Sequence, residues 1–124
     1  MAGLGDRRFF PRIQLHVQGH LKKGEEACIP CAIRDVSSGG AQVSLSISDV
    51  VLESSILEGD LVIVSFAIGR SYEFQAAVVW KQQWRQQVVL GLEWNVTNEE
   101  LINTLELEIA RIIVNRRRLR RRPI

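Results

Sequence analysis

The sequence predicts a mainly β protein, a small six-stranded antiparallel β-barrel followed by a single C-terminal α-helix. Short segments in which apolar and polar residues alternate recur along residues 12–96, with glycine-bearing or polar turns between them, and this spacing is typical of small barrels. From residue 97 the apolar residues recur at intervals of three and four, the period of a helix. With 124 residues, 46% of them hydrophobic, the chain can bury the core of one such domain.

Six segments are expected to form the strands of the barrel. In the first, Ile13, Leu15 and Val17 alternate with polar residues, which indicates one buried face. The polar residues 82–85 are expected to form the loop of the last hairpin. The predicted strands cover residues 12–19, 27–34, 41–47, 61–68, 71–81 and 87–94.

The C-terminal helix is expected over residues 97–118. Thr97 and Glu100 have the spacing of a capping box at its start. Its apolar stripe consists of Ile102, Leu105, Ile109 and Ile112. Further apolar residues widen this surface, so the helix can pack on the barrel, on a second copy of itself, or on both. We favour the barrel, and a homodimer through the helix remains an alternative.

The charge of the chain is uneven. The whole chain carries a net charge of +2, but six arginines lie at the C-terminus, so the remainder is mildly acidic. These arginines are Arg116, Arg117, Arg118, Arg120, Arg121 and Arg122. We expect a frayed basic tail over residues 119–124, because its guanidinium groups repel one another. A uniformly basic surface for nucleic acid is not indicated.

Two short clusters flank the first predicted hairpin, residues 7–12 and residues 35–40. In the first, Pro11 favours an extended chain, so Arg8 and Arg12 point to the same side. Arginine meets phosphate oxygens in bidentate fashion and stacks on purines. Together with the carboxylate, hydroxyls and glycines of the second cluster, this pattern predicts a site for a bis-anionic nucleotide.

Asp35 and Ser37 carry groups suited to a guanine edge, because a carboxylate accepts from guanine N–H groups and a hydroxyl donates or accepts. We expect Gly40 to allow a close backbone approach or to adopt a positive φ. The motifs Arg-x-x-x-Arg, from Arg8 to Arg12, and Asp-x-Ser-x-x-Gly, formed by Asp35, Ser37 and Gly40, resemble the two signatures of the PilZ domain family. Members of that family bind cyclic di-GMP, so the resemblance implies a bacterial cytoplasmic receptor that is not an enzyme.

The resemblance runs from about Arg7 to Trp94 and implies further features of the site. A basic residue at the position of Arg7 implies two intercalated ligand molecules per chain. Trp80 resembles a position at which some members stack a side chain on a base. Residues 1–11 are expected to be mobile without ligand and to be ordered against the barrel by it, which would create a surface for a downstream partner.

Two other functions remain open. One is a small-barrel nucleic-acid-binding protein that uses the C-terminal arginines. The other is a nucleotide-independent PilZ-like scaffold of pilus or secretion machinery. The chain has no apolar run of membrane-spanning length and no secretion signal, which favours the cytoplasm.

Metal or redox chemistry at Cys28 and Cys31 is not favoured, although His16 and His20 lie on the strand expected to pair with theirs. A spacing of three in a strand points the two thiols to opposite faces. Reduced cysteines are the expected state in the cytoplasm.

Overall fold

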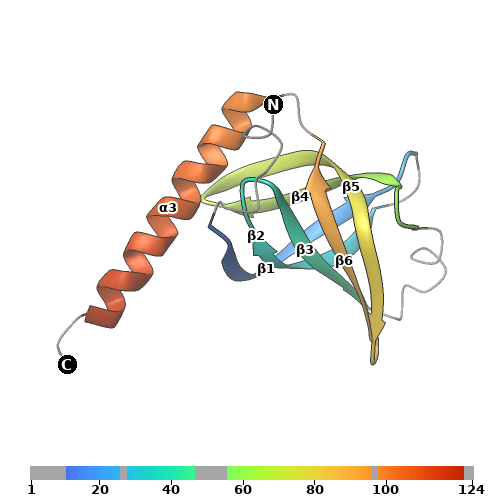
Figure 1. Cartoon of the computed structure of the whole chain (residues 1–124), viewed down its shortest axis with the longest axis horizontal. Coiled ribbons are helices and arrows are strands. Elements are labelled where there is room, and N and C mark those ends of the chain that lie inside the picture. Colours follow the sequence, from blue (N-terminus) through green and yellow to red (C-terminus); the bar gives the residue numbers. More distant parts are fainter. Residues whose placement is uncertain (1–10, 26–27, 47–55, 96–97, 122–124) are drawn as a thin grey trace.

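The computed structural model describes residues 11–25, 28–46, 56–95 and 98–121. Within these ranges the chain forms a closed barrel of six antiparallel strands with one C-terminal helix, as predicted (Figure 1). The strands are β1 (Ile13–Lys22), β2 (Ile29–Val36), β3 (Gly40–Ser46), β4 (Leu61–Ile68), β5 (Arg70–Trp84) and β6 (Gln87–Trp94), and the helix is α3 (Glu99–Arg121). No helix among the described residues is both long and apolar enough to cross a lipid bilayer.

The strands follow the order β1-β2-β3-β6-β5-β4 around the barrel, and β4 closes the circle by pairing with β1. Every neighbouring pair is antiparallel. In a closed sheet of this kind each strand pairs with a neighbour on both sides, so there is no edge strand. The outer surface of β1, β2, β3, β6 and β5 is therefore one continuous face.

Aromatic side chains fill one part of the barrel interior. The rings of Phe74 and Trp94 stack with their centroids 4.5 Å apart, and Phe66 and Tyr72 stack at 5.5 Å. All four residues are buried. Aromatic side chains bury large apolar areas, so this cluster is a main source of the free energy that stabilises the barrel.

Helix α3 closes one end of the core. Its stripe of Ile102, Leu105 and Ile109 is almost completely buried within the same apolar cluster as the barrel interior, so packing on the barrel is confirmed. Beyond the barrel the C-terminal half of the helix extends away from the strands (Figure 1). There Arg116 still reaches β1, because its Nη2 donates a 2.7 Å hydrogen bond to the backbone oxygen of Gln14.

The observed helix differs from the predicted one at both ends. It begins at Glu99, and the side chain of Asn98 caps it by accepting a hydrogen bond from the Leu101 N–H at 3.1 Å; the predicted cap, Thr97, lies outside the described residues. The helix continues to Arg121 through residues expected to fray. Arginine has a high helix propensity, and cations are favoured at the C-terminal end of the helix dipole, so these terms outweigh the repulsion.

The last hairpin also differs from the prediction, because residues 82–84 belong to β5 and are not part of a loop. The turn is reduced to Arg85 and Gln86, and Arg85 adopts a positive φ of 59°. Glutamine at positions 82 and 83 faces solvent on a strand. Polarity alone therefore did not distinguish an exposed strand end from a loop.

Candidate functional site

Five residues form a row across the outer face of the barrel, each paired with the next on the neighbouring strand: Gln14, Asp35, Gln42, Gly91 and Trp80. Residues directly opposite one another in a sheet point to the same side, with Cβ atoms about 4.5–5.5 Å apart. We call this set the cross-barrel row. It brings Asp35 and Trp80, which are far apart in the sequence, onto one surface.

A β-bulge turns each of these two residues out of the core. In β2, Cys31 and Ile33 point inward, and strict alternation would send Asp35 inward as well, but the register shifts between Ile33 and Asp35. In β5 a similar shift lies between Val78 and Trp80. Bulges redirect side chains and are frequent beside functional sites. The two bulges therefore explain why a carboxylate and an indole share the outer face.

The two sequence motifs meet at an ion pair. The Nη1 atom of Arg12 lies 2.7 Å from Oδ1 of Asp35. The arginine side chain is 55% exposed, whereas that of Asp35 is largely covered. The Arg12 guanidinium can therefore turn toward solvent, whereas the Asp35 carboxylate is held in the barrel wall.

Burial raises the pKa of Asp35 above its ordinary value. The Arg12 guanidinium and a hydrogen bond from the Gln42 backbone act in the opposite direction, because both favour the carboxylate. Desolvation is the largest contribution, so the net shift is upward. The carboxylate is therefore less stabilised here than it would be in water. A further hydrogen-bond donor supplied by a ligand would stabilise it.

Ser37 builds the turn between β2 and β3. Its Oγ accepts a hydrogen bond from the Gly39 N–H at 3.2 Å, and its own N–H donates to the Gly40 oxygen at 2.9 Å. The indole N–H of Trp94 donates to the Ser37 oxygen at 3.1 Å. Because Ser37 is buried, its observed role is to fix this turn beside Asp35.

Gly40 is required by a close approach between strands. A Cβ atom at this position would collide with the backbone oxygen of Leu92 on β6. This close approach is between two strands, and the contact with ligand expected at Gly40 stays a prediction. The alternative expectation of a positive φ is wrong, since Gly40 is not among the described glycines with that conformation, which are Gly24, Gly59 and Gly69.

Trp80 lies against the backbone of β6. A Cβ atom at Gly91 would collide with the indole ring, so the glycine makes room for it. The tryptophan remains 37% exposed. An aromatic ring held on the surface in this way is a platform on which a flat base can stack. Gly91 and Gln42 were not among the predicted site residues, although a glycine inside a strand is a known sign of close approach.

Of the three arginines predicted for the site, the described residues include Arg12. Arg7 and Arg8 lie outside the described residues. Pro11 and Arg12 directly precede β1, so the chain enters the barrel beside Asp35.

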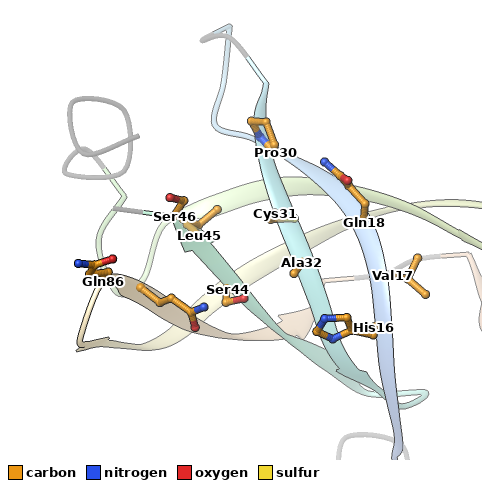
Figure 2. A pocket seen from close by; sticks show the side chains of 11 residues that line it. His16, Val17, Gln18, Pro30, Cys31, Ala32, Ser44, Leu45, Ser46 and Gln86 are labelled. Carbon is orange, nitrogen blue, oxygen red and sulfur yellow. The ribbon is translucent and has the colours of Figure 1, made fainter. Parts of the chain in front are cut away.

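A separate open groove of about 560 Å³ lies on the outer face of β1, β2 and β3. Figure 2 shows His16, Gln18 and Ser44 among its lining residues. None of its described lining residues is Asp, Glu, Lys or Arg, and none was predicted for the site. The groove therefore has no obvious means of binding phosphate, whereas the cross-barrel row has a cation next to it.

The cysteines lie in different environments. Cys28 is exposed and Cys31 is buried, as expected from their spacing. Burial raises the pKa of the Cys31 thiol to about 12, so this thiol is protonated at neutral pH. Among the residues that the structure describes, no three His, Cys, Asp or Glu side chains are grouped to hold a metal ion.

The sequence matches the family model of the PilZ domain over residues 6–111. No curated protein matches it. Among solved structures, the Bacillus subtilis inhibitor of motility MotI/DgrA is similar, with 19% identity, a TM-score of 0.70 and coverage of 95% of this chain and 54% of that one. The PilZ domain of Escherichia coli YcgR, solved with c-di-GMP, gives 13% identity and a TM-score of 0.72, with coverage of 94% and 100%.

A longer structure of Escherichia coli YcgR in complex with c-di-GMP is similar at 19% identity and a TM-score of 0.64, with coverage of 94% of this chain and 48% of that one. The chain therefore spans about half the length of MotI/DgrA and of this YcgR structure. At these identities the similarity establishes the fold.

Proposed function

Because the chain belongs to the PilZ domain family, we propose that it is a receptor for cyclic di-GMP, a binding module of the cytoplasm and not an enzyme. The observation that carries the proposal is the contact between Arg12 and Asp35, which joins the two signature motifs in one place. Two of the similar structures contain c-di-GMP.

The chemistry of the cross-barrel row fits this ligand. Arg12, together with Arg8, supplies guanidinium groups for the phosphates, and arginine binds phosphate in bidentate fashion. Asp35 accepts from the N–H groups on the edge of guanine. Trp80 offers an exposed ring for stacking of a base. Ser37 and Gly40 hold the turn that keeps Asp35 in place.

The ion pair must open, at least in part, when the ligand binds. Exposed ion pairs contribute about 0–1 kcal/mol, so releasing Arg12 from Asp35 costs little. The guanidinium then turns to phosphate, and the guanine N–H groups replace it at the carboxylate. In the free protein the pair keeps both groups close to the positions in which they bind.

We assign Arg7 to a second ligand molecule. Two stacked molecules of cyclic di-GMP carry four phosphate charges, which need more cations than Arg8 and Arg12 provide. The expected stoichiometry is therefore two molecules per chain. Binding would order residues 1–11 against the barrel and present a new surface to a downstream partner.

Isothermal titration calorimetry with cyclic di-GMP tests the proposal. We expect saturable binding near two ligands per chain. Arg12→Ala should weaken it by about 2 kcal/mol, roughly 30-fold, because a charge-assisted phosphate contact is lost. Arg118→Ala is the matched control, since it removes the same charge from an exposed position on α3, and it should bind normally.

Each calorimetric outcome decides a different part of the proposal. If the wild-type protein does not bind cyclic di-GMP at millimolar concentration, the receptor function is contradicted. A stoichiometry near one with Arg7 intact contradicts the second ligand molecule but not the first. Equal loss in the Arg12 and Arg118 variants would indicate a nonspecific effect of charge.

A further inference from the structure

Helix α3 has an apolar seam on its outward face. Leu107, Ala110 and Val114 follow one another at spacings of three and four, which places them on one side of a helix. All three are exposed, and Leu107 is 70% exposed, the highest value among the exposed large apolar residues that the structure describes. We call these residues the outer seam.

The outer seam is not needed for packing against the barrel. The buried residues Ile102, Leu105 and Ile109 already occupy the barrel side of α3. Leu107 lies about 200° around the helix from Leu105, at 100° per residue, and so points away from the barrel. The helix therefore has a second apolar face with no partner among the described residues.

The helix is also polarised in charge. Its first half contains Glu99, Glu100, Glu106 and Glu108, and its second half contains Arg111, Arg116, Arg117, Arg118, Arg120 and Arg121. Arg111 and Glu108 form a pair at 3.7 Å within the helix. Arg116 turns inward to the Gln14 backbone oxygen. Arg117, Arg118 and Arg120 are exposed and lie close together on the helix, which favours a partner that brings negative charge.

We propose that the partner of the outer seam is a second copy of α3, bound antiparallel. In that arrangement a two-fold axis passes next to Ala110, whose small side chain lets the two helices approach. Leu107 of each chain then faces Val114 of the other, because the two residues are equally far from the axis. The acidic first half of each helix then lies beside the basic second half of the other. A parallel pair would instead place the two groups of arginines side by side.

The contact is isologous, since the same seam serves both chains. Three apolar residues on one helix face form a smaller interface than stable dimers have. The charges at both ends of the seam must therefore contribute much of the attraction between the two helices. Because salt screens exposed charges, this attraction weakens at high ionic strength. The expected product is a weak dimer that dissociates on dilution and in high salt. This inference does not depend on nucleotide binding.

Sedimentation equilibrium over a wide range of protein concentration tests the dimer. We expect reversible monomer–dimer behaviour that weakens in high salt. Leu107→Glu should weaken dimerisation at least tenfold. Leu119→Glu is the matched control, because Leu119 is 67% exposed on the same helix but lies on the continuation of the barrel-facing stripe, so it should dimerise normally. A wild type that stays monomeric at every concentration, or equal effects of the two variants, overturns the proposal.

Disulfide cross-linking tests the orientation, in a Cys28→Ser background that leaves the buried Cys31. Ala110→Cys should cross-link, because its two copies meet at the axis. Asn103→Cys should not, since antiparallel helices separate the two copies by ~22 Å along the axis. Cross-linking of Asn103→Cys as fast as Ala110→Cys would indicate parallel helices and contradict the antiparallel arrangement.

Discussion

Asp35 and Trp80 face the same outer surface of the barrel because a β-bulge precedes each of them. Gln42 and Gly91 lie between them in the cross-barrel row. The Asp35 carboxylate, which suits the edge of a base, and the Trp80 ring, which suits its face, are thus fixed on one sheet, on β2 and β5 with β3 and β6 between them. Sites held by strands are positioned more accurately than sites on loops.

Asp35→Asn should abolish tight ligand binding without lowering stability. Burial raises the folded-state pKa of Asp35 from 3.8, so the folded protein loses stability as the pH rises through 3.8, and the loss is complete above the raised pKa. The amide removes this loss at pH 7 and has no effect on it well below pH 3.8. Thermal unfolding should give an equal or higher Tm at pH 7. A clear fall in Tm would show that the ion pair outweighs the desolvation.

Affinity for cyclic di-GMP should fall as the pH is lowered, because Asp35 becomes protonated. Because the pKa of its carboxyl is raised, Asp35 takes up a proton at a higher pH than an ordinary aspartate as the solution is acidified. The protonated form accepts guanine N–H groups less well, so binding weakens through that range. Titrations at a series of pH values should show this fall in the wild type, whereas the weak residual binding of Asp35→Asn should not change with pH. The same fall in both proteins would exclude Asp35 as its cause.

Gly40→Ala should destabilise the barrel by about 1–3 kcal/mol, because the new methyl group meets the backbone oxygen of Leu92, which cannot turn away as a side chain can. Urea denaturation measures the change. Gly24→Asn is the control, since Gly24 has a φ of 58° and open space around it, and asparagine tolerates that conformation. Equal stability of Gly40→Ala and wild type would contradict the close approach of β3 and β6.

Trp80→Ala should weaken ligand binding by about 1–3 kcal/mol through loss of stacking, with little change in the free energy of unfolding. Trp80→Phe should retain part of the affinity because it keeps a ring. Val79→Ala is the control, as Val79 is the adjacent exposed apolar residue. If all three variants bind equally well, the indole is not a platform for the ligand.

The thiols should react at very different rates. In the folded protein a thiol-specific dye should label Cys28, which is exposed, and spare Cys31, which is buried with a pKa of about 12. Thiolate is the reactive form, so both burial and pKa protect Cys31. One equivalent of dye should react in buffer and two in denaturant. Rapid reaction of two equivalents in buffer would show that β2 opens readily.

Much of the fold could be predicted from side-chain periodicity. All six strands were predicted, because each has one buried face, and the stripe from Ile102 to Ile109 was correctly placed on the barrel. Boundaries were less certain where polarity and structure disagree, as at Gln82 and Gln83, which are strand residues in solvent.

The site was predicted by motif more than by geometry. Strict alternation would have placed Asp35 and Trp80 in the core, and periodicity does not reveal the bulges that redirect them. The contributions of Gln42 and Gly91 depend on strand pairing across the barrel, which local sequence does not encode. The ion pair between Arg12 and Asp35 is likewise a product of the pairing of β1 with β2.

The most direct test is an NMR titration of the uniformly nitrogen-labelled protein with cyclic di-GMP. Saturable shifts are expected at the backbone amides of Asp35, Gln42 and Gly91 and at the indole N–H of Trp80, while the buried indole of Trp94 serves as an internal reference. Binding at the cross-barrel row is contradicted if these signals stay unchanged at millimolar ligand, or if the shifts appear instead around His16 and Ser44 in the separate groove.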